Sequence, residues 1–375
     1  MTKLLRLLEV IPGWVFFLLS YVFPRDQKIV VFGIHTGAFS GNIKALLLED
    51  TSLGTNTKKI FIGKNQAIVN TVQSFGIEAY TKYSLKGIWY ALRASTCVYS
   101  SYLSDINYWL SGGAKYVNVW HGTPLKKIER DVNTGYYALR NKYKRLYILA
   151  APYFFVKPDI LLVASEYEKK CFKSAFDVKD DIFLSMFPPR LKTYLSEDFN
   201  ANLRSKILYA PTWRDDHSFT LEEYIDFDRM NDFLSHMKYT LYIKLHPSDN
   251  SCFKGRWSNI VVASQEEDIY TLMKECKILI TDYSSMLFEY LYIDRDVVLF
   301  CPDNQKYQKR SREFYFDICK EPLGEIALDF ESLLEVLKAK IENKKTQQKL
   351  KKAYLPYAEE EDMMKKIIQR LYGQY

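Results

Sequence analysis

Short apolar runs rich in β-branched residues alternate with stretches of helical periodicity along most of the chain. The runs are continuously apolar, which is typical of parallel strands that are covered on both faces. Their alternation with helices predicts βαβ units and therefore an α/β fold with parallel sheets. We expect strands at residues 28–32, 59–62, 95–100, 116–120, 160–163, 181–185, 206–209, 240–244, 259–262, 278–281 and 297–300, and helices at residues 42–48, 165–176, 268–276 and 284–292.

A polar stretch at residues 198–205 separates two series of expected strands. A chain of 375 residues is also too long for one ordinary hydrophobic core and suits two domains. We therefore predict one Rossmann-like domain at residues 28–200 and a second at residues 201–375, the latter with helices at its C-terminal end. Such sheets bind ligands beyond the carboxyl ends of their strands, so informative residues should follow strands directly. The lysine-rich helical tail, residues 328–375, is either a solvated surface or a contact for an anionic membrane or polymer.

Residues 4–23 form an apolar and aromatic segment that Glu9 and Pro12 interrupt. Its uninterrupted part, residues 14–23, is too short to span a bilayer of roughly 30 Å, and no signal-peptide cleavage site follows it. We interpret residues 1–27 as an interfacial, monotopic membrane helix at the cytoplasmic face of the membrane. The alternative is a first helix that packs on the body of the protein.

The net charge of +7 is mild and suits an anionic partner such as a phosphate-rich substrate or a membrane surface. It does not by itself indicate nucleic acid, and no zinc-finger or RNA-recognition signature is present. The six cysteines form no Cys-x-x-Cys pair, and we expect them to be reduced and buried. The sequence also lacks a Walker A loop, a dinucleotide fingerprint, a Gly-x-Ser-x-Gly elbow and a His-Glu-x-x-His site. We expect neither a metal nor a cofactor.

Two of the five histidines lie at the ends of expected strands. His121 ends one strand and precedes the turn Gly122-Thr123-Pro124, while His246 ends a strand in the second half. A histidine held at the mouth of a sheet can act as a general base toward a hydroxyl, because its usual pKa lies near neutral pH. An imidazole that donates a hydrogen bond can also stabilise charge on a leaving phosphate. The alternative for both is a histidine that only satisfies a turn.

Polar side chains that suit phosphate or ribose follow three other expected strands. A guanidinium fork matches phosphate oxygens, hydroxyls at a helix N-terminus form a phosphate site, and an acidic residue can hold a ribose hydroxyl. The plainer alternatives are a loop salt bridge, a helix cap and a surface arginine. The candidate residues are Arg190, Thr212, Trp213, Arg214, Asp282, Ser284, Ser285 and Glu289.

Four blocks, with weaker matches around them, resemble the CDP-glycerol glycerophosphotransferase family of teichoic-acid and capsule synthesis. They are residues 119–127 (VWHGTPLKK), 208–215 (LYAPTWRD), 243–247 (IKLHP) and 279–285 (LITDYSS), and the resemblance runs in the same order from about residue 28 to 330. Two departures occur. Leucine and lysine follow Arg190 where the family usually has Asn-Asp, and the residues just before Asp131 differ from the family pattern.

The resemblance implies a GT-B architecture, in which two Rossmann-like domains face each other across a cleft. The first domain would take the acceptor and the second the donor, CDP-glycerol. The catalytic histidines of the family match His121 and His246, and its donor contacts match the candidate residues named above. Acceptor-side roles fall to Gly122, Thr123, Lys126, Lys127 and Asp131.

The implied reaction is an attack by an acceptor hydroxyl on the phosphorus that bears glycerol. His121 would take the proton and CMP would leave. The acceptor would be a polyprenyl-diphosphate-linked saccharide or a growing polymer at the cytoplasmic leaflet. Three alternatives stay open: a transferase that uses CDP-ribitol, a GT-B glycosyltransferase or epimerase that uses another sugar nucleotide, and a membrane scaffold that only binds nucleotide. A nucleic-acid partner is not expected.

Overall fold

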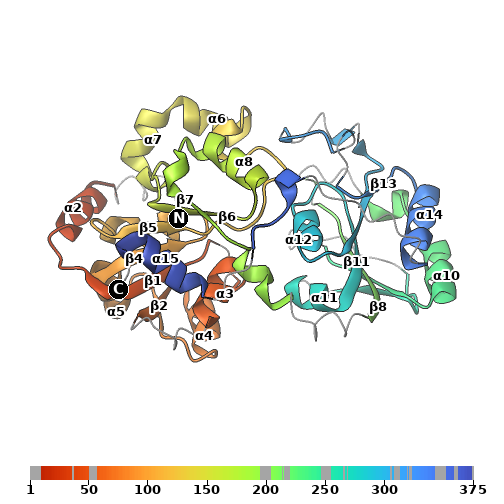
Figure 1. The fold of residues 1–375 in the computed structure, drawn as a ribbon, viewed down its shortest axis with the longest axis horizontal. Coiled ribbons are helices and arrows are strands. Elements are labelled where there is room, and N and C mark those ends of the chain that lie inside the picture. The colour runs from red at the N-terminus through yellow and green to blue at the C-terminus, as the bar shows by residue number, and fades with distance from the viewer. Residues whose placement is uncertain are drawn as a thin grey trace. The chain divides into compact units, whose positions relative to one another are not determined.

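The structure is a computed structural model. It describes residues 10–35, 38–49, 57–194, 204–212, 214, 220–245, 255–264, 267, 269–304, 306–307, 313–318, 320, 323–342, 352–358 and 362–373. The chain divides into two compact units (Figure 1), and each is described by itself. The first unit comprises residues 1–121, 128–192 and 356–375, and the second comprises residues 122–127 and 193–355.

The first unit is built on a seven-stranded sheet in the order β3-β2-β1-β4-β5-β6-β7, in which neighbouring strands are parallel. Gly33 of β1 is in register with Tyr99 of β4, and Tyr99 is in register with Asn118 of β5. The loops that follow these three strands therefore start at the same level of one edge. The strands are β1 (Asp26–Gly33), β2 (Lys58–Gly63), β3 (Ala79–Thr81), β4 (Ala94–Tyr99), β5 (Lys115–Asn118), β6 (Ile160–Val163) and β7 (Phe183–Ser185).

Both faces of this sheet are covered, which explains the continuous apolar runs of its strands. Val30 and Phe32 belong to a core on one face that includes residues of α3, α4 and α15. Val31 lies in the core on the other face, together with Leu103 and Tyr108. The helices of the unit are α2 (Val10–Ser20), α3 (Gly41–Leu48), α4 (Gln66–Gln73), α5 (Leu85–Arg93), α6 (Gly135–Lys142), α7 (Lys144–Ala150), α8 (Glu166–Phe176) and α15 (Met363–Tyr372).

The N-terminal helix α2 packs on the first unit along one side. Phe17 stacks on Tyr108 with ring centroids 4.7 Å apart, and Trp14 Nε1 donates to the Leu149 carbonyl of α7. The other side is apolar and exposed, as Phe16 and its neighbours show. In the part of the chain that the structure describes, no helix is long and apolar enough to cross a membrane. The alternative of a first helix packed on the body of the protein therefore holds for one side of α2.

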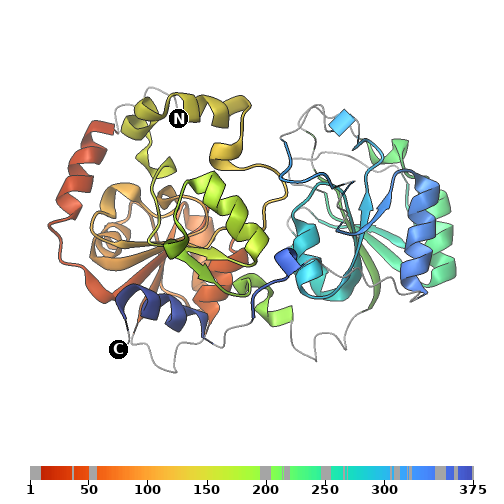
Figure 2. The same ribbon diagram turned by 45° about the horizontal axis from the view of Figure 1, so that its top comes forward.

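The second unit contains a six-stranded sheet in the order β10-β9-β8-β11-β12-β13, again with parallel neighbours. Helices α10 and α14 lie side by side on one face, where their leucines join the core, and α11 and α12 cover the other face (Figures 1 and 2). The elements are β8 (Arg204–Ala210), α10 (Phe227–Met237), β9 (Thr240–Ile243), β10 (Ile260–Val262), α11 (Ile269–Glu275), β11 (Cys276–Thr281), α12 (Met286–Tyr292), β12 (Asp296–Phe300), β13 (Glu325–Ala327) and α14 (Phe330–Ile341).

The predicted α/β class with two parallel sheets is confirmed, but the division of the chain differs from the predicted one. Residues 356–375 belong to the first unit, because the apolar side of α15, including Met364 and Ile367, joins the core of the first sheet. Residues 122–127 belong to the second unit, and that unit resumes at Thr193. Strands β3 and β13, of three residues each, were not expected.

Candidate functional site

His121 follows β5 after a sharp backbone turn. Trp120 has a φ of 44°, in the left-handed region that non-glycine residues rarely adopt. Its N–H donates to Asn118 Oδ1 at 2.9 Å, and its indole packs edge-on against Phe172. The His121 ring stacks on that indole, with centroids 4.3 Å apart. The turn therefore takes His121 off the strand and holds its ring at the carboxyl edge of the first sheet.

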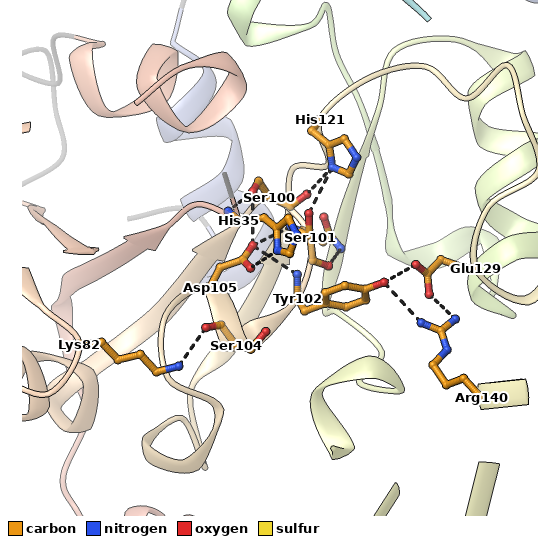
Figure 3. Close-up of polar contacts among 11 residues, drawn as sticks. His35, Lys82, Ser100, Ser101, Tyr102, Ser104, Asp105, His121, Glu129 and Arg140 are labelled. Atoms are coloured by element: carbon orange, nitrogen blue, oxygen red, sulfur yellow. Dashed lines mark hydrogen bonds and ion pairs between the residues drawn. The ribbon is translucent and has the colours of Figure 1, made fainter. Parts of the chain in front are cut away.

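The contacts of the His121 ring define which nitrogen carries the proton. Nδ1 lies 3.1 Å from the Ser100 carbonyl oxygen and 3.3 Å from Ser101 Oγ (Figure 3). A carbonyl oxygen can only accept, so Nδ1 carries the hydrogen and Nε2 keeps its lone pair. Desolvation by the surrounding protein lowers the pKa of His121 below its usual 6.5, and the Arg190 charge lowers it further, while the Ser100 carbonyl opposes this shift. A neutral imidazole with an available Nε2 suits a general base.

The loop after β4 supplies these contacts and is itself held by Asp105. The carboxylate of Asp105 is buried and accepts from the Ser101 N–H at 2.9 Å and the Tyr102 N–H at 3.3 Å. Ser100 Oγ also donates to it at 3.3 Å. Sequence reasoning missed this loop, although its polar residues follow a strand in the same way as His121 does. The same strand-end rule applied to the strand before β5 would have found it.

Asn42 at the start of α3 joins two candidate residues of the first unit. Its amide nitrogen donates to the carbonyls of Val119 at 2.8 Å and Trp120 at 3.2 Å. Its amide oxygen accepts from Arg190, at 3.2 Å from the backbone N and 3.3 Å from Nη1. Arg190 is thus buried in the first unit with the strand end that carries His121, and it is not the surface residue that a lone loop arginine usually is.

In the second unit, Asp282 organises the end of β11. Its Oδ1 accepts from the Thr212 N–H at 2.8 Å and from the Tyr283 N–H at 2.6 Å. Its Oδ2 lies 2.8 Å from Arg214 Nη1. These bonds tie the loop after β8 to the loop after β11, so Thr212 and Asp282 come together as the sequence suggested.

Arg214 does not present the open fork that the sequence suggested. Its side chain is 4% exposed and pairs with Asp303 at 3.1 Å as well as with Asp282. The guanidinium also lies over the Tyr307 ring, 4.5 Å from its centroid. Two carboxylates and an aromatic ring that converge on one arginine make it an internal clamp, because its donors point at protein atoms. Arg214 therefore positions Asp282.

Helix capping explains one of the two serine hydroxyls at the start of α12, which agrees in part with the plainer alternative of a helix cap. Ser284 Oγ accepts from the Met286 N–H at 3.2 Å, whereas Ser285 makes no capping bond through its side chain. A Cβ on Gly122 would lie 3.6 Å from Ser285 Oγ. Glu289 is buried, and its Oε1 accepts from the Tyr270 hydroxyl at 3.3 Å.

The expected acceptor-side residues separate between the units. Thr123 is buried and its hydroxyl lies 3.1 Å from the Tyr292 hydroxyl of α12. Lys127 forms an ion pair with Glu313, and Lys126 lies over the Tyr307 ring. These contacts are what place residues 122–127 in the second unit.

Asp131 stays in the first unit, where it accepts from Ser174 Oγ of α8 at 2.6 Å. Trp213 and His246 lie outside the described residues. Within the described ranges, no group of three or more His, Cys, Asp or Glu side chains could hold a metal ion.

The family model of the CDP-glycerol:poly(glycerophosphate) glycerophosphotransferases matches residues 15–372 of this chain. The chain belongs to this family. The expected CDP-glycerol glycerophosphotransferase is thereby confirmed, and the match extends at both ends beyond the region in which the sequence motifs were found.

Two relatives of this glycerophosphotransferase cover most of its length. A teichoic acid poly(glycerol phosphate) polymerase of Bacillus spizizenii is 28% identical over 93% of this chain and 93% of its own. A teichoic acid glycerol-phosphate primase of Bacillus subtilis is 26% identical over 78% of each chain.

Solved structures of the wall teichoic acid polymerase TagF share the fold of this glycerophosphotransferase. One has a TM-score of 0.69 at 23% identity and covers 94% of this chain and 92% of that chain. A variant soaked with CDPG has a TM-score of 0.70 at 24% identity, with 92% and 91% covered. A Staphylococcus aureus MnaA–UDP structure is more distant, with a TM-score of 0.56 at 10% identity, and covers 92% of this chain and 96% of that chain.

Proposed function

We propose that this chain transfers glycerol phosphate from CDP-glycerol to a hydroxyl of a lipid-linked saccharide or growing polymer, in teichoic-acid or capsule-type synthesis. The observation that carries the mechanism is the contact of His121 Nδ1 with the Ser100 carbonyl oxygen, from which we infer that Nδ1 carries the hydrogen and Nε2 is the base. The acceptor hydroxyl loses its proton to Nε2 as its oxygen forms a bond to the phosphorus that bears glycerol. The bond between that phosphorus and the CMP oxygen breaks, and CMP leaves with the electron pair.

The second unit holds the donor in this proposal. Asp282 and the start of α12 follow β11, and Thr212 follows β8, so these groups share the carboxyl edge of one parallel sheet. Thr212 Oγ1 is a buried hydroxyl without a hydrogen-bond partner among the described residues, which supports a contact with a donor phosphate. Ser284 and Ser285 supply further hydroxyls near backbone N–H groups. Positioning and charge stabilisation do most of the work in phosphoryl transfer, so no resident cofactor is required.

Incubation with CDP-glycerol and a lipid-linked disaccharide tests the reaction. We expect CMP release and a product heavier by glycerol phosphate units. His121→Ala should lower kcat by about a hundredfold or more, because a positioned base contributes on that order. His236→Gln, at an exposed position on α10, is the matched control and should keep full activity. The proposal fails if CMP is never released, or if His121→Ala transfers as fast as the parent enzyme.

The donor alternatives are separated in the same assay. CDP-ribitol in place of CDP-glycerol should react more slowly, and a product heavier by ribitol phosphate at equal rate would reassign the donor. UDP-linked sugars test the glycosyltransferase and epimerase alternative, since enzymes of that kind share the fold at low identity. Release of UDP would favour that alternative. Synthesis that continues in His121→Ala would favour the scaffold alternative.

We also infer that the first unit docks on the anionic cytoplasmic leaflet through α2 and the pair α6–α7. Helices α2 and α7 are neighbours, since Trp14 Nε1 of α2 donates to the Leu149 carbonyl of α7. The exposed apolar side chains of these helices therefore lie on adjacent elements. Lys142, Lys144 and Arg145 are exposed on the same pair and suit anionic headgroups. The apolar residues are Ile11, Val15, Phe16, Leu18, Leu19, Tyr136, Leu139, Tyr143, Leu146 and Leu149.

Sedimentation with vesicles of anionic phospholipid tests this docking. Leu19→Ser and Leu146→Ser should each weaken binding about tenfold, the loss expected for one apolar side chain kept in water. Leu328→Ser, at an exposed leucine of the second unit, is the control and should bind like the parent. Equal binding by all three variants would refute docking through these helices.

A further inference from the structure

His35 lies in the loop after β1, next to the loop that carries the contacts of His121. Its backbone N–H donates to Ser100 Oγ at 3.0 Å, and its ring is edge-on to Tyr102 (Figure 3). Strands β1, β4 and β5 are neighbours in register, so this placement follows from the sheet. His35 therefore belongs to the same edge of the first unit as His121, although the sequence motifs did not single it out.

The His35 side chain has one buried and one open side. Nδ1 lies 3.5 Å from Asp105 Oδ1, while the side chain as a whole is 63% exposed and that of Asp105 is 1% exposed. Among the described residues, Asp105 is the one side chain that forms an ion pair with His35. The other ring nitrogen, Nε2, does not take part in this ion pair. The geometry is that of an imidazole held on one side by a buried carboxylate, on a side chain that is mostly exposed.

Electrostatics distinguish the two histidines that share this loop. The hydrogen bond with Asp105 raises the pKa of His35, and desolvation together with Lys64 works against that rise. The pKa of His121 is shifted in the opposite direction, and the charge on His35 contributes to lowering it. One edge of the sheet therefore carries a neutral imidazole with basic character and, beside it, an imidazole that is more readily cationic.

We propose that His35 binds a phosphate of the acceptor, as a cationic donor that Asp105 fixes in place beside the base His121. This inference rests on the proposed function and deepens it, because it assigns the acceptor an anionic group close to the attacking hydroxyl. A phosphodiester of a growing polyol phosphate chain and a lipid diphosphate have the chemistry required. His35 would contribute to binding of the acceptor and would not take part in proton transfer.

His35→Gln tests this proposal with two acceptors that differ in one group. The first is a neutral alkyl-linked saccharide, and the second is the same saccharide with one glycerol phosphate unit attached. For the phosphorylated acceptor, His35→Gln should raise KM about tenfold to a hundredfold, the usual range for a lost charged hydrogen bond. The kcat should stay within about twofold of the parent. The KM for the neutral acceptor and the KM for CDP-glycerol should not change.

Two further variants complete the test. His35→Lys keeps a cation at this position and should recover most of the affinity for the phosphorylated acceptor, which a purely structural role would not produce. His236→Gln is the matched control on α10 and should leave all three KM values unchanged. Equal losses with both acceptors, a raised KM for CDP-glycerol, or no effect of His35→Gln would each overturn the proposal. Failure of the proposed function gives a different result, since the parent enzyme would then release no CMP with either acceptor.

Discussion

Replacing Glu129 with glutamine is expected to loosen the part of the first unit in which Glu129 joins α6 to the loop after β4, the loop that contacts His121. Glu129 Oε2 lies 2.8 Å from Arg140 Nη2, and their side chains are 6% and 1% exposed. The Tyr102 hydroxyl donates to the other carboxylate oxygen, Oε1 (Figure 3). The Arg140 guanidinium also lies over the rings of Tyr137 and Phe154. Glu129 adopts the left-handed backbone region, with a φ of 48°, so its partners also hold a costly local conformation.

The expected cost follows from the burial of the pair. Glutamine keeps the size of the side chain but leaves the Arg140 charge buried without a counter-ion, which costs about 3–5 kcal/mol of local stability. The double variant Glu129→Gln/Arg140→Met removes that unpaired charge and should recover a large part of the loss. Glu331→Gln removes an ion pair with Arg229 at the surface, where both side chains are more than half exposed. That control should have little effect, because exposed pairs contribute little.

Amide hydrogen exchange along α6 and residues 128–132 is the appropriate assay, since a chain of two units need not unfold in a single transition. Glu129→Gln should exchange faster there by about two orders of magnitude or more, in line with the expected loss. Steady-state kcat should also fall, because Tyr102 belongs to the loop that orients His121. Exchange within about fivefold of the parent would refute this reasoning, as would a double variant less stable than the single one.

Three further outcomes can be checked. Because the pKa of His121 is lowered, kcat/KM should fall only at pH values below 6.5, the usual pKa of histidine. Protonation of His121 then favours the unfolded chain, so stability also falls as the pH falls. A midpoint above 6.5 in the pH–rate profile would contradict this. Asn42→Ala should lower unfolding stability by about 2 kcal/mol and reduce kcat, because buried backbone carbonyls and Arg190 lose their partner; unchanged denaturant midpoint and activity would contradict it. Arg25→Lys should weaken vesicle binding, since the Arg25 guanidinium joins the Ser20 carbonyl at the end of α2 to carbonyls near Ala94; proteolysis rates within α2 should rise in parallel.

The sequence by itself determined the class of fold and the family. Continuous apolar runs reveal strands covered on both faces, because the local pattern records how many sides of a segment are buried. Polar blocks that directly follow such runs mark the carboxyl edge of a parallel sheet, and this identified His121, Thr212 and Asp282 as candidates. Each of these inferences needs only neighbouring residues along the chain.

Only the tertiary structure decided the partners of these residues. The Ser100 carbonyl that sets the His121 tautomer, the Asp105 carboxylate behind His35, and the carboxylates that enclose Arg214 come from segments distant in sequence or from backbone groups. The lysine-rich tail that contains α15 was expected to be a solvated surface or a membrane or polymer contact, whereas the apolar side of α15 joins the core of the first sheet. The physical reason is common to all of them. A local pattern shows that a group must be buried or paired, whereas the identity of its partner depends on which distant segment the fold brings to it.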